Sequence, residues 1–350
     1  MRIAYVDLMT TKGHRDFNVG VVKALMSTGI EVKTFGSSTS FPEDYVLDTV
    51  IPERFFPSEG RRISLFRRKI LELERVKWVL ASLKKQSPWD CVLIGAFETF
   101  SFSRWSYVFS QLSPRVLAFL HYNIDDVSKS LLKQLAFRSI DPNVRLLVLE
   151  PFILDYLTGI NLKNKVFFIP QILECSDSCS NNEGGKQGKL VFAPSGSNSE
   201  ELLTAILKTN DYLVSRNITV IMKGAYELSQ GNVIVKKYFD SDQYAELMKT
   251  CDCVLVAFRR GFNFRVSGVV MDGLCRNKPV IATTCEFTEY MKSIYGNPVF
   301  LIQEITPEQI IDGIDYALAQ DAICWNRNLF CDDHSVHSFI EHFMDALEIL

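Results

Sequence analysis

A loop that leads into a short helix carries residue types well suited to binding a diphosphate. Within VLVAFRRGFNFRVSGVVMDGLCRNKPVIATT (Val254–Thr284), an apolar run is followed by a polar loop that opens at Ser267 and Gly268 into a helical pattern. The first turn of a helix has free backbone N–H groups and the positive end of the helix dipole, and both favour an anion. Asp272 follows about one turn after Gly268 and can accept hydrogen bonds from ribose hydroxyls. We therefore predict a nucleotide-binding enzyme whose site includes Ser267, Gly268, Val269 and Asp272.

Several cations near this turn could neutralise a diphosphate. A diphosphate taken out of water without a cationic partner would carry a large desolvation cost. Arg259, Arg260 and Arg265 precede the turn, and Lys223 ends an earlier apolar run. We expect Arg265 to be the main partner, because it lies directly before the turn that faces the phosphate. A surface arginine held only by solvent is the alternative.

These residues must be positioned by parallel sheets. Short apolar runs alternate with helical patterns along the chain, which is typical of βαβ units. The polar, glycine-rich stretch at 171–188 interrupts the alternation and is predicted to be a linker. We predict an α/β chain with two Rossmann-like domains, over 1–170 and 189–330, that face each other across a cleft. A C-terminal helix is expected within 331–350.

The expected strands of the first half are Arg2–Leu8, Glu31–Phe35, Cys91–Ala96, Val116–His121, Leu146–Leu149 and Val166–Ile169. The expected strands of the second half are Leu190–Ala193, Thr219–Lys223, Val233–Val235, Cys253–Ala257 and Val280–Thr283. Between them the expected helices include Asn18–Ser27, Ser64–Lys85, Ser199–Val214 and Asp242–Thr250.

Composition narrows the class of protein. A chain of 350 residues is too long for most single cores and suits two domains. Its hydrophobic fraction of 47% and charged fraction of 23% are those of a globular protein. The net charge of −3 argues against a general nucleic-acid binder. No uncharged apolar stretch approaches the roughly 18–20 residues that span a bilayer, and Asp7 soon follows the first apolar run, which argues against a signal peptide. A cytoplasmic location is expected.

The nine cysteines are expected to be reduced thiols, most of them buried. No C-x-x-C pair occurs, and Cys175 and Cys179 lack a matching cysteine or histidine pair for zinc, so no metal site is predicted. Near the C-terminus, His334, His337 and His342 are expected to form the polar side of the terminal helix.

The segment Arg54–Lys85 is basic, with ten arginines and lysines against three glutamates. Phe66, Ile70, Leu73 and Leu80 follow helical spacing within it. A basic amphipathic stretch of this kind suits an anionic membrane surface. The alternative is a solvated helix that packs one apolar face on the sheet, and the same helix could do both.

The second half also resembles a known family, the donor domain of retaining "group 1" nucleotide-sugar glycosyltransferases with the GT-B fold. The resemblance runs through VIVKKYFDSDQYAELMKTCDCVLVAF (Val233–Phe258) and SGVVMDGLCRNKPVIAT (Ser267–Thr283). The positions that match the family pattern are Asp242, Tyr244, Asp252, Gly268, Asp272, Pro279, Val280 and Ala282. The resemblance implies a donor site in this half, with a nucleoside diphosphate sugar as substrate and no cofactor or metal.

The chain departs from that family in two places. The family carries two acids with seven residues between them, of which the first contacts the donor sugar and the second the ribose. Asp272 stands at the second position, but the first falls on Phe264, so the motif is degenerate. The family's Arg and Lys after the first strand of this domain are also missing from APSGSNSEELL (Ala193–Leu203). Ser195 and Gly196 could still offer donors at a helix start there.

The first half carries a weaker resemblance. LAFLHYNIDD (Leu117–Asp126) is similar to the family strand that ends in a histidine, which implies that His121 contacts the transferred sugar. An ordinary histidine at a strand end is the alternative. Gly13 and His14 lie in the first loop, where the resemblance places the acceptor, and a purely structural turn is the alternative there.

Together these features favour transfer of a sugar from a nucleoside diphosphate sugar to a hydroxyl of a glycan or lipid-linked acceptor. The resemblance alone implies retention of anomeric configuration. Two rivals remain: a nucleotide-sugar epimerase on the same plan, and a non-catalytic binding protein that kept the fold. The expected location is cytoplasmic, with peripheral attachment to the inner face of the membrane through 54–85 as a further expectation.

Overall fold

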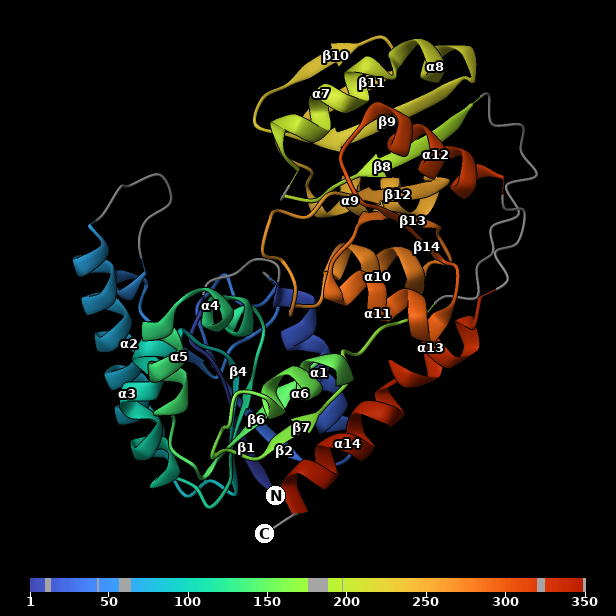
Figure 1. The fold of residues 1–350 in the computed structure, drawn as a ribbon. Helices are drawn as coiled ribbons and strands as arrows, with labels where there is room; N and C mark the ends of the chain where they lie inside the picture. Colours follow the sequence, from blue (N-terminus) through green and yellow to red (C-terminus); the bar gives the residue numbers. More distant parts are fainter. Residues whose placement is uncertain are drawn as a thin grey trace. The chain divides into compact units, whose positions relative to one another are not determined.

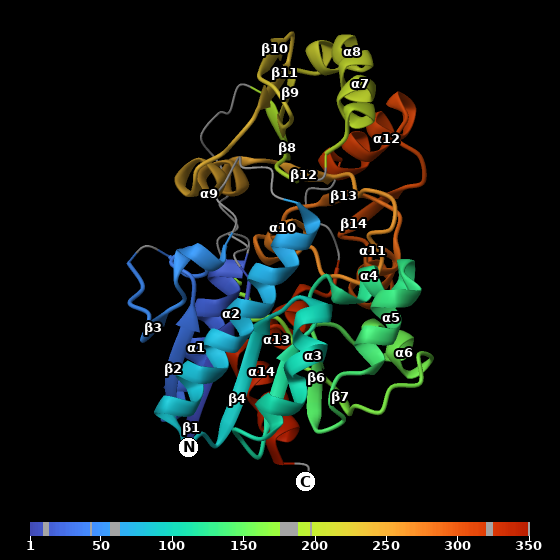
Figure 2. The same ribbon diagram turned by 90° about the vertical axis from the view of Figure 1, so that its left-hand side faces the viewer.

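The computed structural model describes residues 1–9, 14–42, 44–56, 64–175, 188–196, 198–319 and 325–348. The chain forms two compact units. The first unit contains Met1–Ile172 together with the C-terminal segment that begins at His334, and the second contains Leu173–Asp333. In each unit a central sheet is covered by helices (Figures 1 and 2).

The first unit has, within its described residues, a seven-stranded parallel sheet in the order β3-β2-β1-β4-β5-β6-β7. Every residue of β4 and β6 is buried, which explains their nearly continuous apolar sequences. The strands are β1 (Arg2–Asp7), β2 (Glu31–Gly36), β3 (Thr49–Val50), β4 (Cys91–Ala96), β5 (Val116–Phe119), β6 (Val144–Val148) and β7 (Val166–Phe168). The helices are α1 (Arg15–Ser27), α2 (Leu65–Gln86), α3 (Thr99–Ser110), α4 (Asn123–Lys129), α5 (Leu131–Arg138), α6 (Pro151–Thr158) and α14 (Val336–Glu348), with a short 3₁₀ turn at Glu53–Phe55.

Helices cover both faces of this sheet. Figure 1 shows α2, α3 and α5 on one side, and α1 and α14 on the other. Local signals set the helix ends: the Ser64 side chain accepts a hydrogen bond from Arg67 N as α2 begins, and Glu98 accepts one from Ser101 N as α3 begins. Gly29 follows α1 with φ of +81°, a conformation that favours glycine.

The C-terminal helix packs within the first unit. Its Phe339 and Phe343 are fully buried. Arg115 Nε donates to Leu347 O at 2.8 Å, and Arg145 donates to Ala346 O, so two guanidinium groups satisfy carbonyls that the end of a helix leaves free. These contacts give a physical reason for an arginine inside the buried strand β6.

The expectation that His334 lies on the polar side of a terminal helix is wrong. His334 precedes α14 and its side chain is fully buried. Its Nδ1 is 3.1 Å from Gln171 O, and its Nε2 is 3.5 Å from a carboxylate oxygen of Glu150, which is itself 1% exposed. The Gln171 carbonyl satisfies one ring nitrogen, a pairing between distant segments that spacing along the helix cannot reveal.

The second unit has, in the part of the chain that is described, a seven-stranded sheet in the order β10-β11-β9-β8-β12-β13-β14. All neighbours are parallel except β10 and β11, which are antiparallel. The strands are β8 (Lys189–Ala193), β9 (Ile218–Lys223), β10 (Leu228–Gln230), β11 (Val233–Lys236), β12 (Cys253–Val256), β13 (Val280–Thr283) and β14 (Val299–Ile302). The helices are α7 (Glu200–Lys208), α8 (Asn210–Ser215), α9 (Ser241–Thr250), α10 (Gly268–Cys275), α11 (Glu286–Tyr295), α12 (Pro307–Leu318) and α13 (Arg327–Asp333).

One face of this sheet packs against α7, α8 and α12 in a continuous apolar core that includes Leu202, Leu213, Val220, Ile281 and Ile314. Figure 2 shows these helices to one side of the strands, with α9 on the other. Gly273 lets α10 approach β12 and β13 closely, because a Cβ there would lie 3.1 Å from Val280 and 3.3 Å from Val254.

The single helix predicted over Ser199–Val214 is wrong, because the structure contains two helices that meet at Thr209. The Thr209 side chain donates to Ile206 O at 2.7 Å, and its backbone N–H bonds to the same carbonyl at 3.0 Å. A threonine hydroxyl bound to its own chain in this way competes with the helical pattern. The apolar spacing continues across the break, so periodicity alone did not mark it.

The apolar stripe predicted on α2 is only partly buried. Phe66 is 77% exposed and Ile70 is 39% exposed. The buried face contains Glu72 and Arg75 as well as apolar residues. Glu72 makes ion pairs with Arg68 and Lys69, so charged contacts replace part of the apolar pattern. Within the described residues, no helix combines the length and apolarity that a membrane crossing would need.

Candidate functional site

The two sheets share one topological feature, which is a reversal of strand order. In the second unit the reversal falls between β8 and β12, and in the first it falls between β1 and β4. At such a point the loops that leave the two strands run to opposite faces of the sheet and open a crevice at the carboxyl ends. The predicted donor site has two halves, which are Ser195-Gly196 after β8 and the loop 257–267 after β12. Both lie at the reversal of strand order in the second unit.

Hydrogen bonds tie the loops of the second unit to one another. The Asn198 side-chain amide donates to Ala193 O at 2.8 Å and to Lys223 O at 3.1 Å, and so joins the ends of β8 and β9. Arg259 Nη2 lies 3.5 Å from Gly196 O, a long contact that relates the loop after β12 to the loop after β8. The backbone of Lys223 therefore belongs to this framework.

Aromatic stacking holds Arg265 near the helix start. The rings of Phe258 and Phe262 are parallel, with centroids 4.1 Å apart and an angle of 14° between the planes. The Arg265 guanidinium lies over Phe262 at 4.9 Å from its centroid. Stacking orients a guanidinium while leaving its edge able to donate to an oxyanion. Arg259 and Arg260, by contrast, are exposed.

The N-terminus of α10 has the form expected of an anion site. The Ser267 hydroxyl accepts a hydrogen bond from Val270 N at 3.4 Å, so its oxygen caps the helix. Gly268 and Val269 are the first two helical residues, whose N–H groups have no acceptor within the helix. A Cβ at Gly268 or at Gly196 would meet nothing within 4 Å, which leaves open space beside both.

Asp272 is held by a tyrosine from another helix. Tyr244, on α9, donates its hydroxyl to Asp272 Oδ2 at 2.8 Å. Burial, and then the charge of Asp272, raise the pKa of Tyr244, so the phenol remains protonated and keeps donating. Tyr244 matches the family pattern at sequence level, but the contact with Asp272 could not be foreseen from 28 residues away.

A cavity of about 300 Å³ lies elsewhere in this unit. It is lined by Lys189, Arg216, Ile218, Asp315, Leu318 and Ala319. Lys189 and Ile218 begin β8 and β9, so the cavity is at the amino ends of the strands. Ligands of such sheets bind at the opposite, carboxyl ends.

In the first unit, two residues predicted separately are brought together. The rings of His14 and His121 stack, with centroids 4.2 Å apart and an interplanar angle of 28°. His121 follows β5 by two residues, and its Nε2–H donates to Gly95 O at 2.9 Å. Phe17 meets the His121 ring edge-on at 4.9 Å. Gly13, also predicted for this loop, lies outside the described residues.

Both histidines are neutral at pH 7. Burial lowers the pKa of His14 to about 4. Burial, and then the neighbouring His14, lower the pKa of His121 well below its ordinary value. Because Nε2 of His121 donates to a carbonyl, its neutral Nδ1 is the nitrogen left to accept a hydrogen bond.

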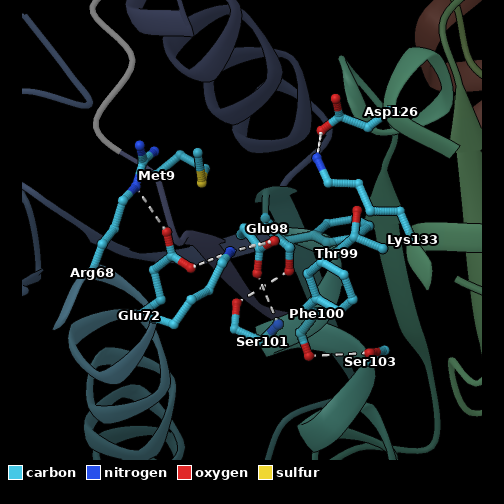
Figure 3. A network of polar contacts seen from close by, with 12 residues as sticks. Met9, Arg68, Glu72, Glu98, Thr99, Phe100, Ser101, Ser103, Asp126 and Lys133 are labelled. Atoms are coloured by element: carbon cyan, nitrogen blue, oxygen red, sulfur yellow. Dashed lines mark hydrogen bonds and ion pairs between the residues drawn. The ribbon is translucent and has the colours of Figure 1, made fainter. Parts of the chain in front are cut away.

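The carboxyl edge of this unit also carries a charge cluster that the sequence did not predict. Lys69 Nζ lies 2.7 Å from Glu72 and 2.7 Å from Glu98. Arg68 Nε lies 3.2 Å from Glu72, and Figure 3 shows Arg68 and Glu72 near Glu98. Burial alone would raise the pKa of Glu98, but hydrogen bonds from Lys69 and from Ser101 N–H lower it. The cluster therefore consists of charges that are paired with one another.

Asp7 closes the same edge at the end of β1. Its carboxylate accepts from Met9 N at 2.7 Å and from the Asn18 amide at 2.6 Å. Asn18 in turn accepts from the Tyr5 hydroxyl at 2.6 Å. Burial raises the pKa of Asp7 to about 7. The one available sequence signal was position, because Asp7 ends the buried strand β1 and Glu98 follows the buried strand β4 by two residues.

Comparison with known proteins supports the architecture. No protein-family model matches the sequence, and no curated protein matches it. Solved structures do match over almost the whole chain. A trehalose-phosphate synthase from Burkholderia xenovorans, in complex with glucose-6-phosphate, is 12% identical with a TM-score of 0.64, and the match covers 100% of both chains. The chain has the GT-B fold.

Two further structures agree with this assignment. Anabaena HepE, in complex with UDP and glucose, is 12% identical with a TM-score of 0.63 over 100% of both chains. A UDP-N-acetylglucosamine 2-epimerase from Rickettsia bellii is 11% identical with a TM-score of 0.65, covering 99% of this chain and 97% of the other. Since GT-B proteins can share this fold and differ in chemistry, the activity must be argued from the site.

Proposed function

We propose that this GT-B chain is a glycosyltransferase that binds a nucleoside diphosphate sugar in its second unit. The observation that carries the proposal is the N-terminus of α10, placed at the strand-order reversal with Arg265 before it and Asp272 one turn after it. The free N–H groups of Gly268 and Val269 and the guanidinium of Arg265 are suited to the diphosphate. The carboxylate of Asp272, held by Tyr244, is suited to the ribose hydroxyls.

In the proposed reaction the sugar C1–O bond to the diphosphate breaks, and a bond forms from C1 to the acceptor hydroxyl oxygen. The leaving diphosphate gains negative charge in the transition state, so fixed amide dipoles and Arg265 would stabilise it most where the barrier is highest. The resemblance to retaining enzymes supports retention of configuration, and it places neither a metal nor a nucleophilic carboxylate in the step.

The first unit is proposed to bind a hydroxyl-bearing acceptor. Its carboxyl edge presents the neutral His14–His121 stack and charges that already pair with one another, such as Lys69 with Glu72 and Glu98. A surface of this kind offers hydrogen bonds without a net charge, which suits a glycan hydroxyl. The assignment of His121 to the transferred sugar remains a proposal from the family resemblance.

Attachment to an anionic membrane is proposed for the start of α2. Leu65 is 79% exposed and Phe66 is 77% exposed, and they are followed directly by the exposed Arg67. Exposed apolar side chains beside cations match the two forces that hold a protein on an anionic bilayer. A lipid-linked acceptor would fit that placement. Binding to vesicles with and without anionic lipid tests it, and equal binding to both would contradict it.

An epimerase is the second candidate, because a UDP-N-acetylglucosamine 2-epimerase shares the fold at a TM-score of 0.65. Such a reaction would use the same nucleotide cradle and would require an acid and a base beside the sugar. Phe264, which replaces the family's first acid, supports a third candidate, a binding protein without turnover.

One experiment separates the three candidates. The purified chain is incubated with a panel of nucleoside diphosphate sugars, with and without glycan or lipid-linked acceptors, and the nucleotide and sugar products are identified. Nucleotide release that depends on an acceptor supports the glycosyltransferase. An isomerised donor supports the epimerase, and binding without any product supports the third candidate.

A further inference from the structure

Three cysteines from distant parts of the second unit meet beside α10. Cys175 lies just after the start of this unit, Cys275 is the last residue of α10, and Cys331 is on α13. The thiols of Cys275 and Cys331 both raise the pKa of Cys175, as neighbouring groups do. Cys275 also donates its S–H to Glu174 O at 3.0 Å, so the segment before the linker is already fastened to the helix.

Exposure distinguishes two of these cysteines from the others that the structure describes. Cys175 and Cys331 are partly exposed, while Cys275 is buried. Cys91, Cys251, Cys253 and Cys285 are all buried. Burial raises the pKa of Cys91 to about 12, so that thiol is inert. A reagent from solution should therefore reach Cys175 and Cys331 before the other described cysteines, and Cys275 lies next to Cys175.

The chemistry open to the cluster is thiol oxidation. Among the described residues, no group of three histidine, cysteine or acidic side chains could hold a metal ion. The Cys275 sulfur lies 3.0 Å from Glu174 O, the carbonyl bonded to Cys175, so the two thiols can meet after a small rotation, provided that their backbones can adopt disulfide geometry. The neighbouring Cys175 lowers the pKa of Cys275, and Cys275 raises that of Cys175, so Cys275 ionises first within the pair.

We propose that Cys175 and Cys275 form a reversible disulfide in response to a peroxide, and that this bond regulates the nucleotide site of the second unit. Cys331 is the neighbouring thiol that does not take part in the bond. The site has no place in the proposed transfer reaction, since its sulfur atoms lie at the opposite end of α10 from Gly268.

The oxidation proceeds in two steps. The Cys275 thiolate attacks one peroxide oxygen and breaks the O–O bond, which gives a sulfenic acid and, after protonation, an alcohol or water. The Cys175 sulfur then attacks the Cys275 sulfur, the S–O bond breaks, and the hydroxyl leaves as water with the Cys175 proton. Two thiols lose two electrons, the peroxide is reduced, and a thiol reductant reverses the bond.

The link to the nucleotide site is the helix itself. Asp272 lies one turn before Cys275 on α10, and the same helix begins at the N–H groups proposed to bind the diphosphate. At the C-terminal end of α10, the hydrogen bonds can open and close. A disulfide there would replace them with a fixed covalent connection. This part of the inference depends on the proposed function, because it takes UDP binding at α10 as its readout.

The test uses the full chain, reduced and then treated with hydrogen peroxide, and it compares Cys175→Ser with Cys331→Ser. After alkylation of the remaining thiols, peptides are identified by mass spectrometry without reduction. We expect a peptide pair that joins Cys175 to Cys275 in the native chain and in Cys331→Ser, and none in Cys175→Ser. The pair should disappear after treatment with dithiothreitol.

The same samples are then titrated with UDP. We expect oxidation to change the Kd of the native chain by about fivefold or more, the lower end of usual coupling between sites, and to leave that of Cys175→Ser unchanged. Absence of the linked peptide, a bond to Cys331, or a linked peptide without any change in Kd would overturn the proposal. If the reduced chain does not bind UDP, the proposed function fails, whereas the linked peptide still decides whether the disulfide forms.

Discussion

The carboxyl edges of the two sheets differ in whether their space is filled by paired charged side chains. Both lie at a reversal of strand order, between β1 and β4 in the first unit and between β8 and β12 in the second. In the first unit the edge is filled with charges that pair internally, such as Lys69 with Glu72 and Glu98. In the second the edge has open space beside Gly196 and Gly268.

This difference indicates that one topology can serve two kinds of ligand. Internally paired charges leave little net field, so the edge of the first unit suits a neutral, hydroxyl-bearing molecule. A helix N-terminus with arginines in the preceding loop produces a positive field at the edge of the second unit, which suits a diphosphate. The predictions below test this contrast, from the largest expected effect to the smallest.

Asp272→Ala should have the largest effect on nucleotide binding. It removes the carboxylate proposed to accept both ribose hydrogen bonds, and it leaves the Tyr244 hydroxyl without this partner. We expect a loss of about 2 kcal/mol, or roughly 30-fold in the Kd of UDP by calorimetry. Glu246→Ala, an exposed acid on α9, is the matched control and should bind normally. Equal affinities for the two variants would remove Asp272 from the site.

Arg265→Ala should weaken UDP binding by about tenfold, the effect of losing one charge-assisted hydrogen bond of roughly 1.4 kcal/mol. Arg260→Ala in the same loop is the control, because Arg260 is exposed whereas Arg265 stacks on Phe262. The loss should shrink as salt increases. A larger loss in Arg260→Ala than in Arg265→Ala would show that Arg260, and not Arg265, binds the diphosphate.

The stacked histidines of the first unit should make the fold sensitive to acid. The folded-state pKa of His14 is about 4, below the ordinary value of 6.5 that applies to the unfolded chain. The uncharged His14 ring therefore makes its full contribution to the stability of the fold above pH 6.5, and this contribution is lost as the pH falls towards 4. For each proton that only the unfolded state takes up, the free energy of unfolding falls by about 1.4 kcal/mol per pH unit.

His14→Gln should show a shallower decline in urea-unfolding free energy between pH 6.5 and 5, by about 1 to 2 kcal/mol relative to the native chain. His337→Gln, an exposed histidine on α14, is the control and should retain the native slope. Identical slopes for the native chain and His14→Gln would mean that the ring is not shielded from protons.

Tyr244→Phe should have the smallest effect. It removes only the hydrogen bond at 2.8 Å that orients Asp272, and it keeps the ring packed near Phe192. We expect a loss of about 1 kcal/mol, or roughly fivefold in UDP affinity. Tyr238→Phe, which is 63% exposed, should behave as the native chain. A loss as large in Tyr238→Phe would indicate a general effect on the unit.

Sequence patterns predicted the fold well because the buried strands are nearly continuous apolar runs. Strand β4 was predicted with its observed bounds, as was β13. The short edge strand β10 was not predicted, because it depends on its antiparallel contact with β11. Thr209 was missed because its side chain ends a helix through a contact that leaves the apolar spacing unchanged.

The geometry of the candidate site was predictable only where its residues are close in sequence. Ser267, Gly268 and Asp272 share one helix, so their spacing fixed their relation. Contacts across the chain gave no such signal. Tyr244 reaches Asp272 from α9, Lys69 reaches Glu98 from α2, and Cys175 meets Cys275 and Cys331 from a segment that was predicted to be a linker.

Hydrogen exchange of the full chain with and without UDP tests the central claim most directly. The account predicts that UDP slows exchange at the backbone amides of Gly268 and Val269 and in the Ser195-Gly196 loop, with no protection at the Asp7 and Glu98 edge of the first unit. Protection confined to that first edge, or no protection at the start of α10, would contradict it.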